Sequence, residues 1–299
     1  LQGKLIPAVR RGRLMLAANC LGAVLAIGAV ALLMPAWLTP TGGKFVYIFG
    51  FTATCFALAA AVVAGIREPR DDYREPARGV RHLFASAWEI VRTDANFSTL
   101  ACVATAFSSS LLLFPHYQAL GRSAPLGLSF DNLLIWLIIQ NAGTALFSLA
   151  AGPIADRCGN RLVLVSVMLG IASMPLVAIA LSYFPAWGRT LYPGVFLMVG
   201  LTPVGFKTFS NYTLEISPPS EHARYLSTLG LCFAVPLVFS PAVGWIVETI
   251  GFTPVFVSVS GYVLFGWSQS VRLEEPRRRY VDRDEDDALA KSDDRFIPP

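Results

Sequence analysis

Three polar side chains recur at four-residue intervals within one long apolar stretch: Lys207, Asn211 and Glu215. Residues four apart lie on the same face of an α-helix, so this spacing predicts a polar stripe along one helix. An ionisable group inside an apolar span is costly and is by default a candidate functional group. Lys207 could therefore bind an anionic group or take part in ion coupling. Alternatively, Lys207 extends its amine to the membrane surface or pairs with Glu215, and neither role needs a ligand.

A second set of polar side chains lies in other apolar stretches and could serve the same chemistry. Imidazole and amide groups there could line a solute path, and a histidine can carry a proton near neutral pH. Hydrogen bonds between helices would explain the same residue types equally well. The residues in question are His116, Gln118, Gln140 and Asn141.

A short charged stretch, residues 152–161, separates two long apolar runs and reads Gly-Pro-Ile-Ala-Asp-Arg-Cys-Gly-Asn-Arg. Gly152 would let two helices approach closely, and Gly159 would permit a tight reversal of the chain. Asp156 could cap a following helix or pair with an arginine. The pattern predicts a membrane hairpin whose turn carries charged side chains.

The composition places all of these residues in a membrane protein. Hydrophobic residues make up 54% of the chain and charged residues only 15%, which exceeds the apolar content of ordinary soluble domains. About 20 apolar residues in a helix cross roughly 30 Å of hydrocarbon. Eight spans are predicted, at 14–36, 45–66, 97–120, 131–154, 162–183, 191–216, 225–248 and 253–270.

Basic residues are distributed unevenly between these spans, and the asymmetry predicts the orientation. Lysine and arginine concentrate in short loops on the cytoplasmic side of membrane proteins. Of the 24 lysines and arginines, 20 fall in segments 1–13, 67–96, 155–161, 217–224 and 271–299. We therefore expect both termini to be cytoplasmic, in an integral multi-pass protein of the inner or plasma membrane. The net charge of +4 is then a sign of topology, and nucleic-acid binding is not expected.

The stretch 152–161 closely resembles the G-x-L-A-D-R-x-G-R-K loop signature of the major facilitator superfamily of secondary transporters. Ile154 replaces the usual leucine, Asn160 the first basic residue, and Arg161 is the second basic residue. A further segment begins Glu-Ile-Ser-Pro at Glu215, followed by Arg224, and resembles the E-x-x-P…R element of sugar-porter members.

The resemblance implies a cytoplasmic gate in which acidic and basic side chains pair when the transporter faces outward. The residues assigned to this gate and its loop motif are Gly152, Asp156, Arg157, Gly159, Arg161, Glu215 and Arg224. The corresponding first-half element would be Arg10, Arg11 and Arg13, and we expect its acidic partner to lie outside this chain. Alternatively, the charges only fix orientation, and each exposed pair then contributes roughly 0–1 kcal/mol.

An internal repeat bears on the domain organisation. Residues 66–73 and 273–280 both follow an apolar pair and share Glu-Pro-Arg-x-x-Tyr, so the first two spans repeat as the last two. Because the family resemblance implies two six-helix halves, the chain corresponds to the fifth to twelfth helices. The expected fold is an all-α polytopic membrane bundle of eight transmembrane helices, an incomplete first half and a complete six-helix second half. The expected parts are 1–66, a cytoplasmic linker 67–96, the six-helix bundle 97–270 and a disordered cytoplasmic tail 271–299.

The second part of the linker is predicted to be an amphipathic helix. Apolar residues recur at helical spacing there, with arginines and a glutamate toward the other side. Such a helix would lie in the headgroup region with Trp88 as an anchor. The alternative is a packed loop helix that makes no membrane contact.

These observations favour secondary active transport of a small solute by alternating access. The alternative is a non-transporting scaffold or sensor with the same fold. An enzyme is not expected, because the sequence has no metal-ligand cluster, no phosphate-binding glycine loop and no nucleophile with a plausible base. No cofactor is expected either. The expected partners are the lipid bilayer, a small-molecule substrate for which an anionic class is one option, and a coupling ion, either proton or sodium.

Overall fold

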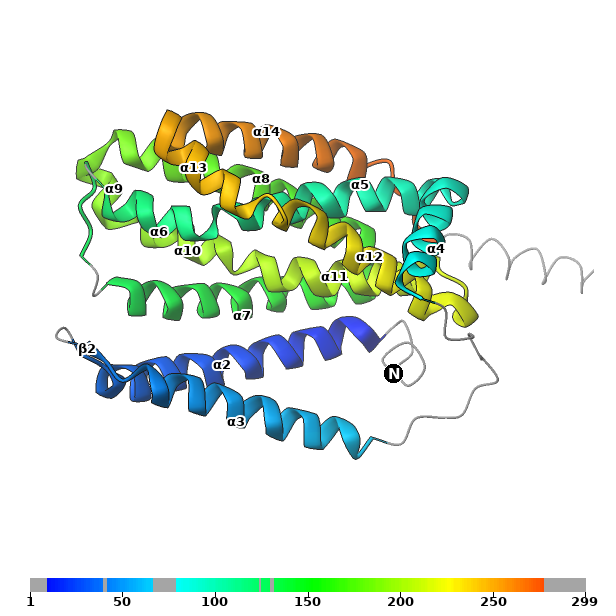
Figure 1. The fold of residues 1–299 in the computed structure, drawn as a ribbon, viewed down its shortest axis with the longest axis horizontal. Helices are drawn as coiled ribbons and strands as arrows, with labels where there is room; N and C mark the ends of the chain where they lie inside the picture. The colour runs from blue at the N-terminus through cyan, green and yellow to red at the C-terminus, as the bar shows by residue number, and fades with distance from the viewer. Residues whose placement is uncertain (1–9, 40–41, 67–78, 124, 130–131, 277–299) are drawn as a thin grey trace, which may run out of the picture.

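The computed structural model describes residues 10–39, 42–66, 79–123, 125–129 and 132–276. These ranges are almost entirely helical, and the long helices run side by side along one common direction (Figure 1). Strands β1 (Leu38–Thr39) and β2 (Gly42–Gly43) form a short antiparallel pair between the first two long helices. The prediction of an all-α membrane bundle is confirmed.

Each predicted span corresponds to one helix or to two or three consecutive helical segments. The first two are α2 (Arg11–Trp37) and α3 (Phe45–Ala64). The third is α5 (Ala95–Ser109), the 3₁₀ turn η2 (Ser110–Leu113) and α6 (Phe114–Arg122), and the next two are α7 (Asn132–Cys158) and α8 (Asn160–Tyr183). The sixth is α10 (Pro193–Val199) with α11 (Leu201–Ile216), after the short α9 (Pro185–Leu191). The last two are η3 (Pro219–Glu221) with α12 (His222–Leu237) and α13 (Ser240–Ile250), and α14 (Phe252–Ser270).

Six of these helical stretches are long and apolar enough to cross a membrane, within the part of the chain that the structure describes. They are Arg11–Trp37, Phe45–Ala64, Ala95–Arg122, Asn132–Cys158, Asn160–Tyr183 and Pro219–Ile250. The other two predicted spans correspond to α10 and α11, which are separated at Gly200, and to α14. Both lie among the long helices of the same bundle (Figure 1).

Two clusters of buried side chains hold the bundle together. One lies toward the 152–161 turn and includes Phe97, Phe107 and Phe209. The other lies toward the opposite ends of the helices, where Trp136 and Phe196 stack with ring centroids 4.5 Å apart. Together the clusters join α5–α8, α10–α12 and α14 around common interior side chains.

Glycines allow two of these helices to touch backbone to backbone. A Cβ atom added at Gly143 would lie 2.2 Å from the carbonyl oxygen of Leu197, and one at Gly200 would lie 2.4 Å from the amide nitrogen of Thr144. Such contacts between small residues are the usual way in which membrane helices pack closely. The break between α10 and α11 is therefore at the point where their backbone meets α7.

The first two spans are packed less fully than the rest. On α2 the buried residues lie in its first half, whereas no residue of α3 is buried. Large apolar side chains of α3 such as Val46, Phe49 and Phe56 are at least 70% exposed. Exposed apolar surface of this kind on a membrane helix faces hydrocarbon or other apolar partners.

One further helix, α4 (Val80–Thr93), lies within the predicted linker 67–96. Residues 67–78 of that linker fall outside the described residues, and so do residues 277–299 of the predicted tail. Most of the first copy of the Glu-Pro-Arg repeat and half of the second copy lie in these two segments. The predicted division of the chain into parts stays a prediction.

Candidate functional site

Asp156, in the last turn of α7, lies against the start of α2. The backbone N–H of Gly12 donates a hydrogen bond of 2.9 Å to Asp156 Oδ1, and Arg13 Nε lies 3.6 Å from Asp156 Oδ2. The first N–H groups of a helix have no partner within it and carry partial positive charge, so a carboxylate there is stabilising. The aspartate side chain is only 11% exposed, whereas that of Arg13 is 82% exposed.

The two helices touch closely at this point. A Cβ atom added at Gly12 would lie 2.4 Å from Asp156 Oδ1 and 2.5 Å from the carbonyl oxygen of Gly152. Gly152 in turn packs against Leu16, whose Cβ would be 2.9 Å from an added Cβ. The expectation that the acidic partner of the first-half arginines lies outside the chain is wrong for Arg13, because α2 packs directly on α7.

The contact continues partway along both helices. Asn19 Nδ2 donates a hydrogen bond of 2.8 Å to Ser148 Oγ in a buried position, and Cys20 Sγ lies 3.8 Å from the carbonyl oxygen of Ala145. The last buried residue of α2 is Ala23, and from there the two helices diverge toward the β1–β2 pair (Figure 1). The α2–α7 seam is therefore packed closely at the end that carries Asp156, and α2 has no buried residue beyond Ala23 toward the other end.

Gly159 forms the turn between α7 and α8. Its φ of +93° lies in the region that favours glycine, as the predicted tight reversal requires. A Cβ atom at this position would also lie 2.4 Å from Glu275 Oε1, so the carboxylate packs directly over the glycine. Both the positive φ and the carboxylate of Glu275 therefore favour glycine at position 159.

The two residues after Gly159 attach the turn to other helices. Asn160 Nδ2 donates a hydrogen bond of 2.9 Å to Glu215 Oε1 at the end of α11, and Asn160 is buried. Arg161 donates through Nη2 to the carbonyl oxygen of Val271, directly after α14. Asn160 departs from the basic residue of the loop signature, yet it supplies a neutral donor to the glutamate of the second motif.

Arg224, near the start of α12, joins the bundle to α4. Its Nη2 lies 2.6 Å from Glu89 Oε2, and its Nε donates a hydrogen bond of 2.6 Å to Ser86 Oγ. A second carboxylate, Glu221, lies 3.5 Å from Nη1. The residues expected to form one gate network therefore contact three different helices. Asp156 contacts α2, Glu215 contacts α8, and Arg224 contacts α4. Arg157 is exposed at the end of α7.

The predicted polar stripe lies on α11. Asn211 is buried, and Lys207 is half-buried. Lys207 makes no hydrogen bond or ion pair with any residue in the described ranges. Glu215, at the end of the stripe nearest the 152–161 turn, accepts the hydrogen bond from Asn160 instead. Pairing with Glu215 therefore does not account for the position of Lys207.

The second polar set lies farther from the 152–161 turn. His116 and Gln118 are half-buried on α6, and Gln140 and Asn141 are half-buried on α7. Asn141 Nδ2 donates a hydrogen bond of 2.8 Å to the carbonyl oxygen of Leu137 in its own helix, so this donor is already used. No group of three or more His, Cys, Asp or Glu residues in the described ranges is arranged to hold a metal ion.

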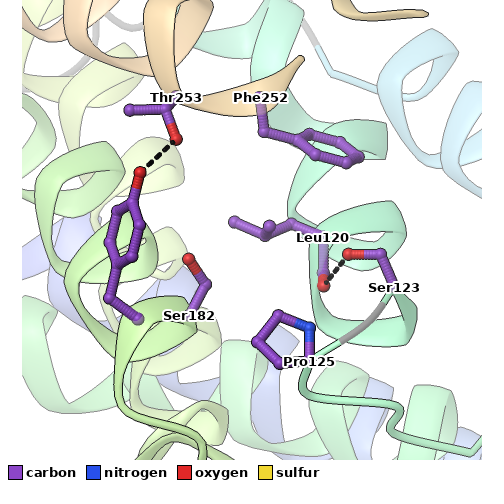
Figure 2. A pocket seen from close by; sticks show the side chains of 7 residues that line it. Leu120, Ser123, Pro125, Ser182, Phe252 and Thr253 are labelled. Atoms are coloured by element: carbon purple, nitrogen blue, oxygen red, sulfur yellow. Dashed lines mark hydrogen bonds between the residues drawn. The ribbon is translucent and has the colours of Figure 1, made fainter.

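A pocket of about 440 Å³ opens at the end of the bundle opposite Asp156 (Figure 2). It lies between the ends of α6 and α8 and the start of α14. Its lining residues are Leu120, Ser123, Pro125, Ser182, Tyr183, Phe252 and Thr253. The hydroxyl groups of Tyr183 and Thr253 are 3.2 Å apart across one side. None of the predicted path residues lines this pocket, and no pattern in the sequence indicates it.

A second cavity, of about 330 Å³, lies between α7, α8 and α10–α11. Its lining is apolar apart from Ser166, whose hydroxyl donates to the carbonyl oxygen of Leu162 in the same helix. An apolar cavity between membrane helices offers no polar group to orient a solute. It is therefore a weaker candidate than the α11 stripe for a transport site.

Comparison with known proteins identifies the family. Residues 123–292, more than half of the chain, match the Major Facilitator Superfamily. The chain belongs to this superfamily. The match begins directly after the third predicted span and includes the 152–161 turn, the α11 stripe and Arg224. Membership places the chain among multi-pass membrane transporters, a class whose members are generally not enzymes.

A curated relative supports the same assignment. Over 135 residues the chain is 27% identical to the uncharacterized MFS-type transporter YfnC of Bacillus subtilis (strain 168). The aligned stretch is 45% of this chain and 31% of that relative, so the chain matches about a third of the relative's length. The similarity supports membrane transport in general and assigns no substrate.

Proposed function

We propose that this protein carries a small solute across the membrane by alternating access, and that the α2–α7 seam is its cytoplasmic gate. The observation that carries the proposal is the contact of Asp156 with Gly12 and Arg13 at one end of helices that diverge at the other. A seam packed closely at one end only is the arrangement that a carrier with two alternating states requires. Both termini are cytoplasmic in this proposal, as the basic segments predict.

The gate works because its contacts exist in one state and are lost in the other. A carboxylate at a helix N-terminus contributes about 0.3–2 kcal/mol, and an exposed ion pair such as Arg13–Asp156 adds roughly 0–1 kcal/mol. A difference of about 1–3 kcal/mol between two states changes their ratio roughly 5–150-fold. The Asp156 contacts are therefore strong enough to favour the closed state and weak enough for a solute to reverse it.

The solute site in this proposal is the polar stripe of α11, at Lys207 and Asn211. A lysine at span depth with no described partner is the residue best suited to an anionic group on the solute. A coupled proton or sodium ion would either bind outside the α11 stripe or be displaced from the stripe when the solute binds. The substrate class is therefore anionic, and the pocket of Figure 2 lies outside this path.

The decisive experiment is solute flux in proteoliposomes. A panel of labelled solutes is tested under imposed proton, sodium and solute gradients, with Asp156→Asn as the gate variant. Glu248→Gln is the matched control, because Glu248 is an exposed carboxylate at the far end of α13. We expect saturable flux that falls in Asp156→Asn and is retained in Glu248→Gln. No flux of any solute under any gradient would favour the scaffold or sensor alternative.

A further inference from the structure

Helix α4 lies across the end of the bundle rather than along it (Figure 1). It ends at Thr93, directly before α5 begins at Ala95, and it packs beside the start of α12 at His222. The ends of membrane-spanning helices mark the boundary between hydrocarbon and water. The position of α4 therefore corresponds to the depth of the lipid headgroups, with its axis roughly parallel to the membrane surface.

The two faces of α4 differ sharply in burial. Ser86 and Ile90 are 8% and 3% exposed and face the protein. Leu83, Phe84 and Trp88 are 54%, 60% and 63% exposed. A helix that only bridges water between helices would carry polar side chains on its outer face. The outward apolar face therefore indicates an apolar or amphipathic partner.

The charged residues on the exposed face of α4 indicate which kind of partner covers it. Arg81 and Arg92 are exposed, and with Phe84 and Trp88 they recur at three- and four-residue intervals, so the four lie along one face of the helix. Neither arginine makes a hydrogen bond or ion pair with the described part of the chain. Aromatic residues flanked by arginines are typical of helices that lie in the interface of anionic membranes.

We propose that α4 binds the surface of an anionic phospholipid leaflet. Leu83, Phe84 and Trp88 insert among the upper acyl chains, and Arg81 and Arg92 contact lipid phosphates. The proposal rests on the membrane-spanning architecture and does not depend on which solute is carried. Each arginine near such a surface favours anionic over neutral lipid by roughly fivefold.

The opposite face of α4 makes this lipid contact relevant to the rest of the molecule. Arg224 of α12 binds Glu89 and Ser86, and the hydroxyl of Tyr225 donates a hydrogen bond of 3.0 Å to Asp94 Oδ2. Asp94 also accepts a hydrogen bond of 2.9 Å from the N–H of Phe97 and so caps α5. In this proposal α4 connects the leaflet surface to the starts of α5 and α12. The charge of the lipids would therefore affect the position of both helix starts through α4.

The test uses the whole protein in nanodiscs of equimolar phosphatidylglycerol and phosphatidylcholine. Bromine atoms, which quench tryptophan fluorescence at short range, are placed on the acyl chains of only one lipid at a time. The signal of Trp88 is the difference between the unsubstituted protein and Trp88→Phe. We expect this signal to be quenched several-fold more by brominated phosphatidylglycerol, and the preference to be lost in the double variant Arg81→Gln/Arg92→Gln.

Trp187 supplies the matched control. It is 71% exposed on α9, at the end of the bundle opposite α4, so its quenching should not change in the double arginine variant. An unquenched Trp88 signal in both lipid mixtures would overturn the proposal, because another part of the protein or water would then cover the face. Equal quenching by both lipids, or a preference that survives the arginine changes, would overturn it as well. Transport activity enters none of these readings, so they are independent of the proposed carrier function.

Discussion

The backbone N–H of Gly12 and the carboxylate of Asp156 meet across 144 positions of sequence, at a distance of 2.9 Å. The contact joins the free N–H groups at the start of α2 to a nearly buried negative charge at the end of α7. Such a contact needs only a glycine on one helix and an acidic side chain on the other. It is therefore a specific point at which the α2–α7 seam can be tested.

Asp156→Asn should weaken this end of the seam, because the amide oxygen keeps a hydrogen-bond acceptor but loses the charge that the α2 N-terminus stabilises. The native Cys20, half-buried in the seam, reports separation of the helices. We expect the rate of its alkylation by a water-soluble maleimide, followed by peptide mass spectrometry, to increase by a factor between about 1.7 and about 30, which corresponds to about 0.3–2 kcal/mol.

Arg13→Gln is the comparison variant for Asp156→Asn. Because the Arg13 side chain is 82% exposed, its ion pair with Asp156 is worth roughly 0–1 kcal/mol and should be weakened by salt. The rise in Cys20 alkylation should therefore be smaller, and it should shrink further at high ionic strength. An equal or larger effect of Arg13→Gln would show that the ion pair, not the helix terminus, holds the seam.

Gly12→Ala should open the seam by a steric route. The added methyl group would lie 2.5 Å from a backbone oxygen of Gly152, which cannot move away as a flexible side chain could. Gly28→Ala on the same helix is the matched control, because a Cβ there has no atom within 4 Å. Alanine is the better helix former by about 1 kcal/mol, so the control should unfold at an unchanged or higher temperature.

Two measurements test Gly12→Ala against Gly28→Ala: the thermal unfolding midpoint, monitored by intrinsic fluorescence, and the alkylation rate of Cys20. Gly12→Ala should lower the midpoint and raise the alkylation rate, while Gly28→Ala should do neither. If Gly12→Ala behaves like its control in both measurements, α2 and α7 do not touch as closely as the structure shows.

Gly159→Ala should destabilise the protein through backbone strain and through a clash with Glu275. Gly251→Ala should cause only the backbone strain, so comparing the two variants separates the two effects. Gly159 and Gly251 both have positive φ, +93° and +84°, with ψ of 160° and 175°, so alanine at either costs on the order of 1–3 kcal/mol in backbone strain. Only at Gly159 would the new methyl group also meet Glu275, whereas Gly251 has open space. The unfolding midpoint should therefore fall further in Gly159→Ala, and equal decreases would mean that Glu275 yields without cost.

The helices could be predicted from the sequence because the length of an apolar run alone determines whether it crosses a membrane. The span predicted at 14–36 is α2 at Arg11–Trp37, and that at 162–183 is α8 at Asn160–Tyr183. The break at Gly200 was not predicted, since it depends on the backbone of α7 at Gly143 and Thr144. The short α9 was not predicted either, because seven residues give little periodic signal.

The site was predictable only where a residue type by itself fixes the geometry. Gly159 has the positive φ that its place in the loop motif indicated. Partners distant in sequence could not be predicted, because hydropathy does not specify which helix packs beside which. The family resemblance places the partner of Arg13 outside the chain, yet Arg13 lies beside Asp156, and Asn160, which departs from the loop motif, binds Glu215.

Lys207→Ala separates a binding role for the lysine from a structural one. If the ammonium group binds an anionic solute, its removal should lower the affinity for that solute by about tenfold or more in proteoliposome uptake, the usual effect of losing a hydrogen bond to a charged group. Stability should stay the same or rise, because a charge without a described partner at span depth is costly. Lys44→Ala, at the hairpin end of α3, controls for the change in net charge. Unaltered affinity for every anionic solute, or a lower unfolding midpoint, would remove Lys207 from the proposed path while leaving the Asp156 gate untouched.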